Sequence, residues 1–146
     1  MPRVIHFELI HLPSHTPYQV GIYISQEKVL FTGDNFTNKW QPSLANCYPL
    51  EWIESLKRIE AMDADFIVPG HGEVGNKMAF REFKVFIQGA VDTVRKAIHQ
   101  GISKEEAAES ISFEGQLTAW HPGTERQRVN VVQLYEMLSK QDKGRH

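Results

Sequence analysis

The sequence predicts one α+β domain, on three observations. Short runs rich in β-forming residues dominate the first third of the chain, whereas longer stretches with apolar residues at helical spacing fill most of the rest. At 146 residues the chain can bury a hydrophobic core but is too short for two independent domains. We therefore expect a single domain over residues 1–140, followed by a frayed tail at residues 141–146.

The first strands are predicted near the N-terminus. The run "VIHFELIHL", residues 4–12, is rich in β-formers and stops at Pro13, which has no N–H to donate to a sheet ladder. Two shorter apolar runs, residues 20–24 and 28–32, are separated by a polar Ser-Gln-Glu segment, a pattern typical of a hairpin. We expect the pair Gly33-Asp34 to close the second hairpin strand.

The rest of the chain is predicted to be helical apart from its loops and one strand. Residues 35–49 show no regular pattern and contain Asn, Pro and Ser, so they predict a long functional loop. Residues 66–68 predict a short buried strand that runs into the loop "PGHG". Helices are indicated by amphipathic spacing of the apolar residues, by a capping box that begins at Ser103 and by a stop signal at Gly101. These helices are expected at residues 50–62, 76–100, 103–111 and 127–140.

Composition narrows the partners and the compartment. Charged residues make up 23% of the chain and the formal net charge is −2, which gives no electrostatic case for nucleic acid or an anionic membrane. Cys47 is the single cysteine, so no internal disulfide can form and nothing indicates an oxidising compartment. Neither a signal peptide nor a membrane-spanning run is visible, and we expect a cytoplasmic protein.

Three residues with metal-binding side chains share one predicted position, the exit of a strand into a loop. They are His15 in "LPSHTP", Asp34 in "TGD" and His71 in "PGHG". The ends of neighbouring strands lie along one edge of a sheet, so these side chains could meet there. Two imidazoles and a carboxylate are ligands that suit zinc, iron or manganese. Taken singly, each has a structural alternative, since Asp34 could be a turn residue and each histidine could simply belong to its loop.

The ordered motifs His-Thr-Pro, Gly-Asp and Pro-Gly-His-Gly occur in "HLPSHTPYQVGIYISQEKVLFTGD" and "EWIESLKRIEAMDADFIVPGHGEVG". In this order they resemble the C-terminal half of the metallo-β-lactamase superfamily of metal-dependent hydrolases. The resemblance covers nearly the whole chain and implies half of the family's αββα sandwich, a mixed β-sheet covered by helices. It also implies that His15 binds a first metal, that His71 binds a second and that Asp34 bridges both as the catalytic carboxylate. Zinc is the implied metal, with iron or manganese as alternatives, and the implied substrate is a small molecule.

The sequence departs from the family in what it lacks. The family's His-x-His-x-Asp-His loop, which supplies most of the remaining ligands, does not occur in it, nor do the N-terminal strands of the sandwich. A catalytic zinc normally has three protein ligands and an open water position, whereas one copy of this chain offers at most two at each metal. A half-sandwich also exposes a sheet edge and an apolar face. We therefore expect a homodimer in which each copy replaces the other's missing half, or pairing with a separate N-terminal half.

Two functions follow from these observations. The first is a metal-dependent hydrolase of an ester, thioester or lactam-type bond, incomplete as a single chain. The second is a non-catalytic, truncated half-domain that forms a homodimer and binds metal weakly or not at all. Among the aromatic residues, we expect Trp40 to form a wall of the substrate site and Trp52 to lie in the core. His121, in "TAWHPG", is expected to be a packed or surface residue and not a ligand.

Overall fold

The computed structural model describes residues 3–113, 120 and 124–144. The prediction for His121 therefore lies outside the described residues. In this part of the chain no helix is both long and apolar enough to cross a bilayer. The elements are, in order, β1 Glu8–His11, β2 Val20–Ile24, the short 3₁₀ helix η1 Ser25–Glu27, β3 Val29–Thr37, α1 Pro49–Ala61, β4 Phe66–His71, α2 Lys77–His99, α3 Lys104–Ser110 and α5 Thr124–Lys143.

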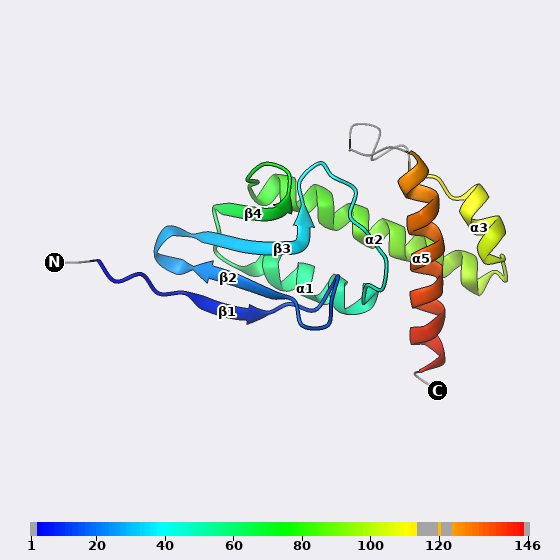
Figure 1. Cartoon of the computed structure of the whole chain (residues 1–146), viewed down its shortest axis with the longest axis horizontal. Coiled ribbons are helices and arrows are strands. Elements are labelled where there is room, and N and C mark those ends of the chain that lie inside the picture. Colours follow the sequence, from blue (N-terminus) through cyan, green and yellow to red (C-terminus); the bar gives the residue numbers. More distant parts are fainter. Residues whose placement is uncertain (1–2, 114–119, 121–123, 145–146) are drawn as a thin grey trace.

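The strands form one mixed sheet in the order β1-β2-β3-β4 (Figure 1). The first three strands pair antiparallel through short connections, whereas β4 pairs parallel to β3 after the crossover through α1. One row across the sheet is Leu9, Ile22, Phe31 and Val68, each opposite the next. The expected α+β fold with a mixed sheet is thus confirmed.

The third strand differs from its prediction at the residues that matter most. It does not end at Gly33-Asp34 but continues to Thr37, so the expected strand end there is wrong. The physical reason is its partner: β4 is also longer than expected, and Thr37 lies opposite His71 in the parallel ladder. Pro69 is tolerated within β4 because this strand lies at the edge of the sheet.

The helices agree closely with the periodicity of the sequence. The Asn76 side chain accepts a hydrogen bond from the N–H of Ala79 and so caps α2, which ends before Gly101 in the left-handed conformation (φ 74°). The Ser103 hydroxyl caps α3 by accepting from the N–H of Glu106, as the predicted capping box requires. The last helix extends beyond the predicted residues 127–140 at both ends.

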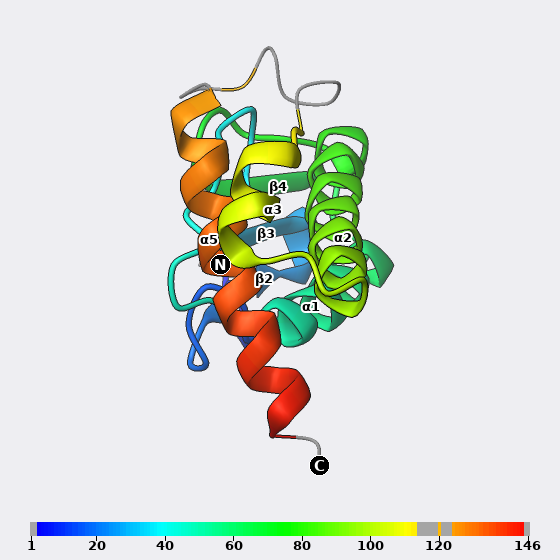
Figure 2. The ribbon, with the colours of Figure 1, turned by 90° about the vertical axis from the view of Figure 1, so that its right-hand side faces the viewer.

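Both α1 and α2 cover the same face of the sheet, and α5 stands across its end beside α3 (Figures 1 and 2). The covered face contributes Leu30 and Ile67 to the core, both fully buried. Phe36 lies edge-on to two phenylalanines of α2, with ring centroids 5.5 Å away in each case. Trp52 is also fully buried, which confirms its predicted place in the core. The core therefore forms on one side of the sheet.

The opposite face of the sheet carries no described helix and is apolar. Side chains alternate between the two faces of a strand, so the row through Leu9, Ile22 and Phe31 points away from the core. Their exposed fractions are 74%, 37% and 40%. The predicted exposure of an apolar face is present in the structure.

The reactivity of the buried Cys47 thiol reports how tightly the loop before α1 is packed. The thiol is fully buried, and burial raises its pKa to about 12. Because the thiolate is the reacting species, we expect a disulfide reagent at pH 8 to modify the native protein at least about 100-fold more slowly than the urea-unfolded chain. Absorbance of the released thiol measures both rates. Equal rates would mean that this loop opens readily.

Candidate functional site

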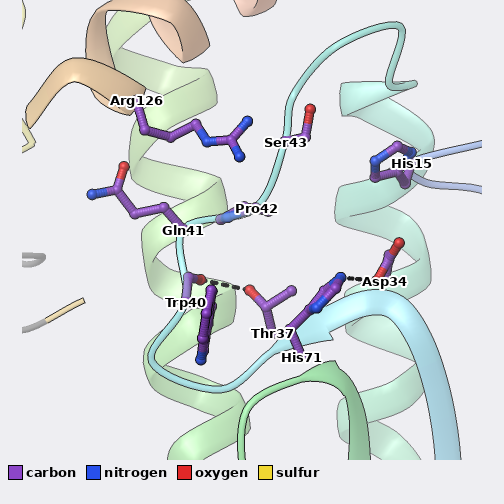
Figure 3. Close-up of a pocket in the computed structure, with 9 residues that line it drawn as sticks. All are labelled: His15, Asp34, Thr37, Trp40, Gln41, Pro42, Ser43, His71 and Arg126. Atoms are coloured by element: carbon purple, nitrogen blue, oxygen red, sulfur yellow. Dashed lines mark hydrogen bonds and ion pairs between the residues drawn. The ribbon is translucent and has the colours of Figure 1, made fainter. Parts of the chain in front are cut away.

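A cavity of about 210 Å³ lies at the end of the sheet where β3, β4 and the loop between β1 and β2 meet the start of α5 (Figure 3). It combines two histidines, one carboxylate, one arginine and small polar side chains with an aromatic wall. The residues that line it are His15, Asp34, Thr37, Trp40, Gln41, Pro42, Ser43, His71 and Arg126. All three residues predicted from the strand-to-loop exits therefore lie at one pocket.

The loop that carries His15 is fixed through its backbone. The carbonyls of three consecutive residues just before this histidine each accept a hydrogen bond from a different part of the fold. Leu12 accepts from the Asn35 side chain at 3.1 Å and Pro13 accepts from the Ser55 hydroxyl at 2.7 Å. Ser14 accepts from the N–H of Tyr48 at 2.7 Å. The position of His15 is thus set by β3, by α1 and by the loop that precedes α1.

Asp34 and His71 face one another from the two parallel strands. The register of β3 against β4 shifts on either side of Gly33, which has a positive φ of 55°. This irregularity turns Asp34 toward the end of β4, where its Oδ1 lies 3.3 Å from Nε2 of His71. Both side chains are partly exposed to the cavity. A carboxylate and an imidazole therefore share one wall of the pocket.

The glycines of "PGHG" are required by close packing at this point. A Cβ at Gly70 would collide with the Asp34 carboxylate and lie 2.8 Å from the carbonyl carbon of Gly33. Gly72 has φ 92°, and a Cβ there would meet the Asn38 carbonyl. His71 is thereby held between two residues that have no side chain.

The role of Gly70 can be separated from ordinary backbone strain. Its φ lies outside the left-handed region, so Gly70→Ala should destabilise through the steric conflict alone, by about 1–3 kcal/mol. It should also move the NMR resonances of the His71 imidazole. Gly101→Ala is the control for backbone strain without a steric conflict, because Gly101 has a positive φ of 74° and an added Cβ there would meet no neighbouring atom. Urea unfolding measures the stability of both variants. An unchanged His71 resonance in Gly70→Ala would show that the contact between Asp34 and His71 does not depend on the packing at Gly70.

The donor types of the pocket fit a divalent metal, but one chain does not enclose it. Imidazole and carboxylate are common ligands of zinc, iron and manganese. Among the described residues, however, no three His, Cys, Asp or Glu side chains lie close enough together to hold a metal ion. Asp34 and His71 are in contact, whereas His15 lies farther along the same wall, with its ring centroid 6.4 Å from that of Trp52. The described residues of one chain therefore do not form a complete metal site by themselves.

Several lining residues could not be recognised in the sequence. Gln41, Pro42 and Ser43 belong to the loop after β3, and Arg126 comes from the first turn of α5. The buried Asn130 of α5 links these two segments. Its amide donates to the carbonyl of Pro42 at 3.0 Å and accepts from the N–H of Leu44 at 3.2 Å. No local motif predicts such a contact across more than eighty residues.

Trp40, the residue predicted to form a wall of the site, lies at the pocket. Trp40 lines the cavity, is 41% exposed and lies with its ring centroid 6.2 Å from that of His71. The Thr37 hydroxyl donates to the Trp40 carbonyl at 2.7 Å and so fixes the start of this loop (Figure 3). His11 takes no part in the pocket, because its Nε2 lies 2.7 Å from the carbonyl of Pro17.

Comparison with known proteins agrees with this fold and these motifs. A family profile described as "Metallo-beta-lactamase superfamily" matches residues 1–71. A linear primary-alkylsulfatase of a Pseudomonas species is 23% identical over 129 residues, 79% of this chain and 24% of the relative. A probable metallo-hydrolase of Methanocaldococcus jannaschii is 35% identical over 86 residues, 55% of this chain and 41% of the relative.

The fold is likewise similar to that of solved members of this group. The structure of the inverting sec-alkylsulfatase Pisa1 of a Pseudomonas species superimposes with a TM-score of 0.69 at 18% identity, over 90% of this chain and 23% of that one. The chain spans less than half the length of each of these three proteins. The residues that match the metallo-β-lactamase superfamily profile, 1–71, thus include His15, Asp34 and His71.

Proposed function

We propose that this chain supplies one half of a metal-dependent hydrolase site, with His15, Asp34 and His71 as its contribution. The observation that carries the proposal is their meeting at one pocket from three separate segments, two of them fixed by tight packing. The hydrolase class of the relatives supports the same function. In the proposed roles His15 and His71 bind one metal each and Asp34 serves both.

A bound zinc, iron or manganese ion would polarise the scissile bond and lower the pKa of a water molecule. The chain's own residues hold that ion and shape the cavity around the substrate. Trp40 and Pro42 provide an apolar wall, and the paired Asp34 and His71 lie at its base. A sulfate ester is the first substrate to test, because two of the similar proteins are named as alkylsulfatases.

A second polypeptide layer completes the site in this proposal. The open face belongs to the same strands that carry Asp34 and His71, and its paired side chains are apolar apart from His11, which lies opposite Val20. No Lys, Arg, Asp or Glu side chain interrupts the apolar set, so the face complements a copy of itself as well as any other apolar sheet. We assign the cover to a second copy of this chain. The open face comprises Leu9, Val20, Ile22, Ile24, Val29, Phe31, Phe66 and Val68.

The assignment to a second copy is tested by mass in solution. Light scattering after size-exclusion chromatography should give twice the 16.8 kDa chain mass at about 50 μM, a concentration that saturates a micromolar dimer. Phe31→Lys should give a folded monomer, since a charge at the centre of the open face cannot be buried without a partner.

Val85→Lys is the matched control for this substitution, because Val85 is 58% exposed on α2, away from the open face. It should leave the dimer intact. A wild-type chain that stays monomeric and well folded would count against the second copy and leave a separate covering chain as the occupant to seek.

Metal content and hydrolysis test the proposed chemistry. Protein purified without chelator should contain zinc, iron or manganese by mass spectrometry, and His71→Ala and Asp34→Asn should lose at least about 90% of it, because each removes a ligand from a small set. Activity on an alkyl sulfate, a thioester and a chromogenic β-lactam should fall in parallel. His99→Ala removes an exposed histidine on α2 and should change neither quantity.

A non-catalytic dimer is the second candidate function. It is favoured by the absence of any three-ligand group among the described residues. A protein that dimerises, contains no metal and hydrolyses none of the three substrates would establish this second function and overturn the first.

A further inference from the structure

Arg126 differs from the other arginines of the described chain. Each of the others has a carboxylate or carbonyl partner: Arg3 pairs with Glu27, Arg58 donates to the carbonyl of His11, Arg81 pairs with Glu60, Arg95 with Asp142 and Arg128 with Glu109. Among the described residues, no hydrogen bond or ion pair engages the guanidinium of Arg126. A half-buried cation without a counter-ion is costly unless something binds it.

The guanidinium of Arg126 lies at the pocket and reaches toward Ser43 (Figure 3). The Ser43 hydroxyl oxygen accepts from the N–H of Ala45 at 3.4 Å, which leaves its O–H available as a donor into the cavity. Arg126 and Ser43 thus present donors at one end of the pocket. Asp34, the one carboxylate in the described lining, is at the other end beside His71.

The cavity therefore has a positively charged residue at one end and a carboxylate at the other. Donors and a positive charge stand at the α5 end, and the Asp34–His71 pair stands at the sheet end. Pro42 lies between these two ends in Figure 3, and Trp40 lines the cavity on the side of His71. A ligand that matches this order carries a compact oxyanion, which a guanidinium binds with two parallel hydrogen bonds, and an apolar body that lies against the tryptophan.

We propose that Arg126 and Ser43 form an anion subsite that binds the negatively charged group of the substrate. This inference rests on the proposed hydrolase function and names its substrate class, an anionic compound with an apolar body. Sulfate monoesters and carboxylates share the required chemistry. Asn130, one turn after Arg126 in α5, binds the loop that carries Ser43 on both sides of that residue and so holds the two segments together.

Binding to the metal-free protein tests the subsite directly. The 146-residue chain, treated with chelator, is titrated with hexyl sulfate, hexanoate and hexanol while tryptophan fluorescence is followed, since Trp40 is partly exposed in the cavity. We expect both anions to bind more tightly than hexanol. Arg126→Gln should weaken binding of the preferred anion roughly 10- to 100-fold, the range for a lost hydrogen bond to a charged group, and leave hexanol unchanged.

Arg128→Gln is the matched control, because Arg128 lies two residues away on the same helix and pairs with Glu109 at 3.8 Å. It should bind both anions as the wild type does, and circular dichroism should confirm that both variants are folded. Equal loss of binding in the two variants, equal affinity for hexanol and the anions, or unchanged affinity in Arg126→Gln would each overturn the subsite. The relative affinities of hexyl sulfate and hexanoate distinguish the two anion chemistries.

The test separates this inference from the hydrolase proposal. Anion binding that depends on Arg126 in a protein without metal or activity would support the subsite and reject only the reaction. Hydrolysis of an anionic substrate with a KM unchanged by Arg126→Gln would reject the subsite and leave the reaction standing.

Discussion

The parallel pairing of β3 with β4 is the constraint on which the rest of this structure depends. It extends β3 past Gly33, brings Thr37 opposite His71 and turns Asp34 toward the end of the neighbouring strand. The close approach is possible only because Gly70 has no side chain to collide with the carboxylate. Since β4 follows directly from α1 and leads through the glycine-rich segment into α2, the same pairing also fixes the helical layer against the sheet.

The two faces of this sheet have opposite environments, and the difference connects the fold to the proposed function. One face is sealed by α1 and α2 around Trp52 and Phe36. The other is apolar and exposed, and the same strands lead to a pocket whose candidate metal ligands are too few for a complete site in the described chain. In the proposed dimer a single partner accounts for both the exposed apolar face and the incomplete ligand set. The partner covers the face and also supplies the remaining ligands.

The sequence predicted the elements well where the pattern is local. Helical periodicity and capping residues located α1, α2 and α3, and the order of His15, Asp34 and His71 predicted that these residues would meet. Their role as metal ligands stays a prediction. The end of the pocket formed by Ser43 and Arg126 could not be predicted from the sequence. Asn130 joins the segments that carry these two residues, and no local motif indicates contacts between such distant segments.

The amino-acid sequence by itself determined the class of the domain, its family motifs and the glycines that flank His71, because each depends on residues close together in the chain. Only the tertiary structure decided where β3 ends and that Arg126 faces the pocket without a partner among the described residues. The physical reason is the same in both cases. A bulge and a pocket wall arise from pairing between distant segments, and their geometry depends on packing that no single segment contains.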